Sequence, residues 1–258
     1  MATFQPRVHW RALTLMYPPL PGRLRPSAKL KSARLCAVFA GLACCGQCHA
    51  ARPLITDDAR IVDPGACQVE SWVRSNRNST EGWALPGCNP SGNLELTLGG
   101  GRLHDGTGTR TTSLVLQGKT LFRPLEANGW GWGAALGVAS DPRTGARDVY
   151  GYLPVSWSLR NDHSFLHANL GVKQEGLVKL RQITWGLGLE QPVADHFGLI
   201  GEAFSQDKGR PFLQFGLRYW VLRDRVQLDA TAGNRMGSAT NERWFSIGLR
   251  LLTPPFLP

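Results

Sequence analysis

The stretch NGWGWGAALGVAS, from Asn128 to Ser140, decides the fold class of this 258-residue chain. Its glycines disfavour a helix, and with a period of two its residues separate into a large apolar face and a nearly bare face. The large face carries Trp130, Trp132, Ala134, Leu136 and Val138, and the bare face carries Gly131, Gly133, Ala135, Gly137 and Ala139. Such a strand fits against another sheet in a soluble sandwich, or lines the lumen of a barrel.

Similar alternating runs recur along the chain and favour the barrel. After Cys67 no stretch has a sustained helical period, and turn residues separate twelve short runs. The runs are residues 66–75, 83–87, 93–103, 112–122, 128–140, 149–159, 165–173, 183–191, 197–206, 211–221, 225–233 and 243–252. The sequence therefore predicts an all-β fold, an antiparallel transmembrane β-barrel of about twelve strands, with about ten or about fourteen as alternatives.

The connections between the runs also differ in length. After alternate runs they tend to be longer, such as SDPRTGARD at 140–148, and between these they are shorter, such as LRD at 222–224. Outer-membrane barrels place longer loops outside the cell and short turns in the periplasm. With an even number of strands, both ends of the barrel are then expected on the periplasmic side.

The composition of the runs favours a membrane barrel over a soluble one. In lipid, backbone polar groups must pair within the protein, and no segment after residue 50 suits a spanning helix. Polar or charged residues on the second face of most strands argue against the alternative, a soluble secreted β-barrel or sandwich that binds an apolar ligand. Trp130 and Trp132 predict an aromatic girdle, with Trp185, Trp220 and Trp244 also near strand ends, and the glycine face is expected to point inward.

The net charge of +10 is located mainly in the first fifty residues. This segment holds seven of the 29 basic residues and none of the 19 acidic ones, so the rest of the chain has a net charge of +3. No nucleic-acid partner is therefore predicted.

Residues 1–50 have the pattern of a secretory leader with a signal peptide. Lys29, Lys31 and Arg34 form a charged region before the apolar Leu35–Gly46, which is too short to span a bilayer. Cys48-His49-Ala50 resembles a cleavage site. The prediction is export to the bacterial outer membrane, with a mature chain that begins near residue 51.

Three alternatives for the leader stay open. A buried core helix is one, and a lipoprotein signal that ends at Cys44 or Cys45 is another. Residues 1–28 also make the leader long, and a true translation start at Met16 or near Leu30 would place them upstream of the protein. The predicted division is thus a leader over 1–50, a periplasmic or lumenal segment over 51–65, and the barrel over 66–258.

Export also sorts the six cysteines. Four of them lie in the leader, so the mature chain keeps Cys67 and Cys88, which an oxidising compartment would join as a disulfide. Both lie near the predicted short-turn rim, and the bridge would close a loop of about 22 residues and stabilise the fold by about 3 kcal/mol. Two free thiols are the alternative.

Charged and polar residues on the second face are candidates to line the lumen. They are Glu95, Lys119, His167, Lys173, Glu190, Glu202, Arg218, Asp229 and Arg250. Structural ion pairs that fill a narrow barrel are one interpretation, and a solute path is the other. Glu202 and Asp229 lie among small or apolar neighbours and need partners, which Arg218 or Arg250 would supply.

Asp57 and Asp58 lie before the first run and have three possible roles. They would cap a turn, enter the lumen as part of a plug, or bind a partner.

Catalytic motifs are weak in this chain. His163, Ser164 and His167 are the candidates for an outer-membrane lipid hydrolase, but their spacing departs from such motifs, and His163-Ser164 falls in a predicted periplasmic turn. The sequence contains no metal-binding cluster, phosphate-binding glycine loop or CxxC motif, so neither a metal nor another cofactor is predicted. We expect a protein that is not an enzyme.

The segment ARPLITDDARIVDPGACQVESWVR, residues 51–74, resembles the start of the "MetA-pathway of phenol degradation" family of outer-membrane transporters. The TDDA stretch carries the resemblance, and further similarity lies at HANLGV (167–172), TWGLGLEQPV (184–193), GEAF (201–204) and VQLDATAG (226–233). The chain departs from the family in its two cysteines and in the tail TPPFLP after the last run. The resemblance implies a barrel that passes or binds small molecules, aromatic or hydrophobic ones among them.

Together these observations predict an outer-membrane channel or transporter for a small-molecule solute. Its expected partners are outer-membrane lipid and the outer-membrane assembly machinery.

Overall fold

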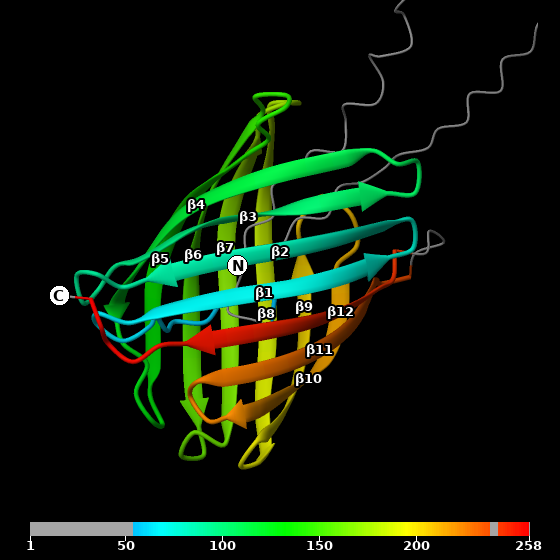
Figure 1. The fold of residues 1–258 in the computed structure, drawn as a ribbon. Coiled ribbons are helices and arrows are strands. Elements are labelled where there is room, and N and C mark those ends of the chain that lie inside the picture. The colour runs from blue at the N-terminus through cyan, green and yellow to red at the C-terminus, as the bar shows by residue number, and fades with distance from the viewer. Residues whose placement is uncertain (1–53, 238–241, 258) are drawn as a thin grey trace, which may run out of the picture.

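The chain forms a closed barrel of twelve antiparallel strands (Figure 1). The structure, a computed structural model, describes residues 54–237 and 242–257. The strands are β1 (Cys67–Asn76), β2 (Ser79–Cys88), β3 (Glu95–Asp105), β4 (Arg110–Arg123), β5 (Trp130–Ser140), β6 (Arg147–Leu159), β7 (Ser164–Glu175), β8 (Leu180–Ala194), β9 (Phe197–Ser205), β10 (Phe212–Leu222), β11 (Val226–Arg235) and β12 (Trp244–Leu252). Each strand pairs with the next, and β12 pairs with β1 to close the ring. The predicted fold class is confirmed.

Strand β2 is longer than the sequence predicts. The alternation suggested only residues 83–87, whereas the strand spans Ser79–Cys88. Its large apolar residues Trp83 and Leu85 are buried, and its outward positions include Pro86 and Ala84. In this strand the large apolar residues face inward and the small ones face outward. The alternation therefore differs from that of a lipid-facing strand, and the sequence predicts only part of β2.

The two rims of the barrel differ less in loop length than the sequence suggests. On one rim the shortest connection is residues 77–78 and the longest is residues 236–243. On the other rim the shortest connection is residues 195–196, and the longest ones are of the length of residues 124–129. The strands continue into the polar residues that were assigned to long loops, which shortens those loops. Both ends of the sheet, at Cys67 and Leu252, lie on the same rim (the C-terminal rim).

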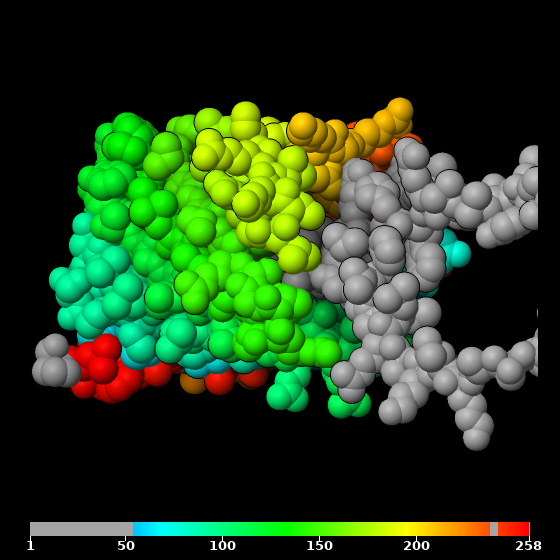
Figure 2. All heavy atoms as spheres, turned by 90° about the horizontal axis from the view of Figure 1, so that it is seen from above, coloured from blue at the N-terminus to red at the C-terminus, as the bar shows by residue number. Residues whose placement is uncertain are grey.

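The outer surface of the barrel is apolar. Leu136 at 71% exposure and Leu187 at 58% point away from the lumen, as does Leu189 at 43%. The space-filling view shows the middle strands as a continuous wall, with the C-terminal residues at its left end (Figure 2). This belt suits contact with lipid hydrocarbon. Among the described residues, no helix is both long and apolar enough to cross a membrane.

The glycine face of β5 points inward, as predicted, but it does not border open space. Gly137 lies opposite Tyr150 in the β5–β6 pairing, and a Cβ atom at Gly137 would lie 2.0 Å from the Tyr150 hydroxyl oxygen. Gly233 is likewise covered by its cross-strand partner Trp244. The glycines therefore make room for inward aromatic rings on the next strand.

An aromatic girdle lies along part of the C-terminal rim, on β5, β6 and β10. Trp130 and Trp157 pair across β5 and β6 and are both exposed, and the Arg123 guanidinium lies 4.5 Å from the Trp130 ring centroid. Trp132 and Trp220 are half-buried near the same rim.

Two of the tryptophans expected in the girdle lie elsewhere. Trp185 is half-buried inside β8, away from both strand ends. Trp244 points into the lumen, where its indole N–H donates to Gln214 at 3.1 Å. The alternation in β12 puts Phe245 outside, so Trp244 must point inward.

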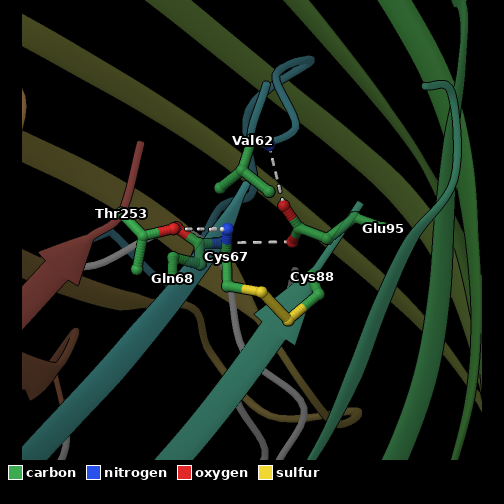
Figure 3. The surroundings of a disulfide bond; sticks show 6 residues. All are labelled: Val62, Cys67, Gln68, Cys88, Glu95 and Thr253. Carbon is green, nitrogen blue, oxygen red and sulfur yellow. Dashed lines mark hydrogen bonds between the residues drawn. A yellow bond between two sulfur atoms is a disulfide. The ribbon is translucent and has the colours of Figure 1, made fainter. Parts of the chain in front are cut away.

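Cys67 and Cys88 form the predicted disulfide (Figure 3). They are directly opposite in the β1–β2 pairing, with Cα atoms 4.0 Å apart. The Cys67 backbone N–H also donates to the Thr253 hydroxyl at 2.9 Å. The bridge and this contact fix the first and last strands at the C-terminal rim.

Candidate functional site

A segment outside the strands fills part of the barrel lumen. Residues 54–66, here called the plug, precede β1 and form no strand, and residues 54–59 are all buried. Val62 contacts Glu95 at the C-terminal rim, whereas Ile55 packs with Phe204, Phe212 and Trp244 near the opposite strand ends. The plug therefore runs lengthwise through the lumen.

The deep end of the plug is held through its backbone. The Glu202 carboxylate accepts hydrogen bonds from the backbone N–H groups of Ile55 at 2.7 Å and Thr56 at 2.8 Å. Nearer the C-terminal rim, the Ser156 hydroxyl accepts from the backbone N–H of Ala59 at 2.8 Å. These donors have no strand partner, so the inward-facing side chains satisfy them.

The end of the plug near the C-terminal rim is held in the same way (Figure 3). Glu95 accepts from the backbone N–H of Val62 at 2.9 Å and from the Gln68 amide at 3.1 Å. The Asn89 amide donates to the Val62 carbonyl at 2.7 Å. Backbone groups of the plug thus contact polar side chains at both ends of the lumen.

Two acids of the plug form ion pairs in the lumen. Asp57 accepts from the Lys119 ammonium at 2.9 Å and from the Tyr152 hydroxyl at 2.7 Å. Asp58 accepts from the Arg60 guanidinium at 2.8 Å. Burial opposes the ionisation of Asp58, but the positive charges of Arg60 and Lys119 outweigh it and hold the pKa of this carboxyl below its usual range.

Arg60 links the plug to a charged cluster on strands β7, β8 and β10. Its guanidinium lies 3.0 Å from Glu190, which also pairs with Arg218. His167 approaches the same carboxylate at 3.5 Å, and its Nδ1 lies 2.8 Å from the Ser156 hydroxyl. Glu190 therefore lies between two guanidinium groups, one from the plug and one from the wall of the barrel.

The predicted lumen-lining residues all face the interior. Eight are buried, and the Arg250 side chain is 17% exposed. Glu95, Lys119, Glu190 and Glu202 contact the plug. Lys173 instead pairs with Asp148 at 2.9 Å, and Arg250 donates to Gln68 at 2.8 Å.

The two lone acids differ in their surroundings. Asp229 lies opposite Arg218 in the β10–β11 pairing. Glu202 has the plug backbone as its partner in place of an arginine. The plug has no periodic pattern, so the sequence could not reveal this contact.

The catalytic candidates do not assemble as a unit. His163 is exposed in the turn before β7, and Ser164 donates to Gln191 at 2.7 Å. His167 faces Ser156, its cross-strand partner in β6, which the sequence reasoning missed. Among the described residues, no group of three or more His, Cys, Asp or Glu side chains could hold a metal ion.

Two cavities adjoin the plug. A pocket of about 600 Å³ at the C-terminal rim is lined by Arg60, Phe165, Glu190 and Arg218, among others. A small cavity of about 20 Å³ lies beside Asp57 and Lys119 and is also lined by Leu85 and Val115. The wide pocket reaches into the lumen as far as the Arg60–Glu190 pair.

Solved structures of porins have the same fold. The NanC porin matches with a TM-score of 0.55 and 8% identity over 72% of this chain and 98% of that one. The KdgM porin, in complex with disordered oligogalacturonate, matches with a TM-score of 0.53 and 8% identity over 71% of this chain and 98% of that one. An outer membrane channel from Pseudomonas putida F1 has a TM-score of 0.49 and 14% identity over 76% and 97% of the two chains.

Sequence comparison gives a family but no curated relative. No curated protein matches this sequence. The name of the phenol-degradation family, suggested by the TDDA stretch, is not confirmed. The matching family model covers residues 39–252, so this chain belongs to the family described as "Uncharacterised conserved protein UCP029691".

Proposed function

We propose that this protein is a bacterial outer-membrane channel for small solutes, which the plug closes. The apolar belt, the girdle around Trp130 and Trp157, and the closed barrel support a location in a membrane. The leader pattern of residues 1–50, which lie outside the described residues, supports export. The porin fold is compatible with a path along the barrel axis.

The way in which the plug is held carries this proposal. Residues 55–62 contact the wall through side-chain hydrogen bonds and ion pairs, such as those of Glu202 and Lys119. Only the rim end of the plug, at Gly65 and Ala66, makes backbone hydrogen bonds outside it, to Asn89 and to the C-terminal tail, among the described residues. None of the ladder hydrogen bonds of the barrel depends on it, because residues 54–66 belong to no strand. The plug can therefore leave while the ring of twelve strands stays intact, and its exit would open a polar path through the lumen.

The inward aromatic rings support small aromatic molecules as the solutes. Trp72 and Trp83 stack in the lumen with ring centroids 5.9 Å apart, and Tyr150 and Tyr152 belong to the same buried cluster. Flat faces of this kind pack well against aromatic solutes. The acids and bases around them would exclude solutes that are wholly apolar.

An engineered disulfide between plug and wall tests the channel function. A Cβ atom at Gly188 would lie 3.5 Å from the Thr56 Cβ, which is within the range that a disulfide needs. We expect the variant Thr56→Cys/Gly188→Cys to show no openings in planar bilayers when oxidised. After reduction, its openings should match those of the wild type in the same reductant.

The single variants Thr56→Cys and Gly188→Cys are the matched controls, because neither can lock the plug. Equal conductance of the oxidised and reduced double variant would show that the plug is not the gate. If neither the wild type nor any variant conducted ions under any applied voltage, the channel function would be wrong.

A further inference from the structure

We propose that Lys119 and Tyr152 form a carboxylate-binding subsite for the solute, and that Asp57 of the plug occupies this subsite in the closed protein. The ligand class is a small aromatic carboxylate. This inference rests on the proposed channel function, since it identifies the solute that replaces the plug.

The contacts of Asp57 are those that a free carboxylate would make. One oxygen accepts from the Lys119 ammonium at 2.9 Å, and the other accepts from the Tyr152 hydroxyl at 2.7 Å. A cation on one oxygen and a neutral donor on the other recognise the carboxylate group without the rest of an aspartate. Any carboxylate that reaches this position can accept the same two hydrogen bonds.

The donors belong to the wall, whereas the carboxylate belongs to the movable plug. Lys119 lies on β4 and Tyr152 on β6, and both are buried. When the plug leaves, Lys119 loses Asp57 and also Asp58, whose carboxylate lies 3.6 Å from the ammonium. The loss of two carboxylates beside a buried ammonium is costly, so the vacated position favours an anionic solute over a neutral one.

One wall acid competes for the same ammonium. Glu95 is the cross-strand partner of Lys119 in the β3–β4 pairing. Its carboxylate accepts from Gln68, a side chain of the wall that stays in place when the plug leaves. Glu95 therefore lowers the affinity of the subsite without filling the position of Asp57, between Lys119 and Tyr152.

The surroundings of the subsite fit an aromatic body. Leu85, Val115 and Tyr152 belong to one buried apolar cluster. The cavity of about 20 Å³ between this cluster and the Asp57–Lys119 pair is contiguous with the volume of the plug. A ring attached to the carboxylate would therefore contact Leu85 and Val115, and these contacts add apolar burial to the ion pair.

Calorimetric titration of the detergent-solubilised mature protein tests the subsite without any measurement of transport. The probes are benzoate and benzamide, which share a ring and differ in charge. In Asp57→Ala the internal competitor is absent, so benzoate should bind at least about tenfold more tightly than to the wild type. Benzamide should bind that variant at least about tenfold more weakly than benzoate.

Further variants test which side chains bind the carboxylate of benzoate. Asp63→Ala is the control, because Asp63 is an exposed acid of the plug, and its loss leaves Asp57 on Lys119 and should not raise the benzoate affinity. In the Asp57→Ala background, Lys119→Met should abolish benzoate binding and Tyr152→Phe should weaken it. Asp57→Asn, which keeps the shape of the side chain, replaces Asp57→Ala if the latter does not refold.

The outcomes separate the subsite from the channel function. Equal affinities for benzoate and benzamide, unchanged binding in Lys119→Met, or no binding to either Asp57 variant would overturn the subsite. Benzoate binding in a protein that never conducts ions would support the subsite and reject the channel. Conductance without benzoate binding would reject the subsite alone.

Discussion

The Glu202 carboxylate and the Ile55 backbone nitrogen lie 2.7 Å apart, although 147 residues separate them in the sequence. The same carboxylate accepts from the backbone N–H of Thr56. Because Glu202 recognises backbone groups, this contact does not depend on which side chains stand at positions 55 and 56. The side chain of Ile55 makes a separate contact, because it packs against Phe204 and Phe212.

Replacement of Glu202 by glutamine should release the plug and preserve the barrel. The amide keeps the shape of the side chain but removes the charge that strengthens both hydrogen bonds. We expect the open probability in planar bilayers to rise about tenfold, which corresponds to the loss of a hydrogen bond to a charged group. Glu175→Gln is the matched control, since Glu175 contacts Lys173 and Gln182 away from the plug. Failure of Glu202→Gln to fold would contradict the assignment of this residue to the lumen.

An arginine at position 187 should destabilise the barrel in lipid. Leu187 is 58% exposed on the outer surface, where a charge meets hydrocarbon. The expected loss in the free energy of unfolding is about 2–4 kcal/mol. It would be measured by denaturant titration after refolding into lipid vesicles, with Leu187→Met as the control. An unchanged midpoint for Leu187→Arg in vesicles would argue against the membrane-facing belt.

Loss of the Cys67–Cys88 bridge should lower stability without changing the fold. The bridge spans 21 positions, and closing a loop of that size stabilises by about 3 kcal/mol. Mass spectrometry without reduction should find the two cysteines joined in protein from its native compartment. The double variant Cys67→Ser/Cys88→Ser should unfold at a lower denaturant concentration. Two free thiols in the native protein would contradict this prediction.

Acidification should loosen the plug through Asp58. Because burial is outweighed by the charges of Arg60 and Lys119, the pKa of Asp58 is depressed in the folded protein. The ionised Asp58 carboxylate therefore stabilises the docked plug fully above the unfolded-state pKa of about 3.9. This stabilisation is lost as the pH falls through the pKa of Asp58 in the folded protein. Through Asp58, the open probability should rise as the pH falls below about pH 4.

The variant Asp58→Asn provides the comparison for this pH dependence. It should be more open than the wild type at neutral pH, and it should respond less to acid. If the wild type and Asp58→Asn had the same acid response, Asp58 would not be the group that titrates.

Removal of the leader should leave a mature chain that begins near Ala51. The pattern around Cys48-His49-Ala50 predicts cleavage there. N-terminal sequencing of protein isolated from membranes would identify the first residue. Retention of residues 1–30 in that material would refute the prediction.

The strands could be predicted from the sequence, because a period of two follows directly from strand geometry. Contacts between strands could not, since they depend on register. The ring of Tyr150 over Gly137 is such a contact, and so is the Ser156–His167 pair. Its position at a strand end suggests that Trp244 belongs to the girdle. The alternation with the outward Phe245 shows instead that Trp244 points inward.

The charged lumen could be predicted in the same way as the strands, because its members alternate with apolar residues. The plug contacts could not be predicted, because residues 54–66 have no period and their partners are distant in the sequence. A plug is one of the three roles that the sequence allows for Asp57, and it assigns neither Lys119 nor Tyr152 to this residue.

The plug also imposes an order in time on the maturation of the chain. Residues 54–66 precede every strand in the sequence, yet their partners Glu95, Lys119, Ser156 and Glu202 lie on β3, β4, β6 and β9. The segment that is synthesised before the barrel can reach its final position only after those strands have come together around it. Docking of the plug is therefore a late event in assembly. A chain that has not yet added β9 lacks Glu202 and cannot complete the docking.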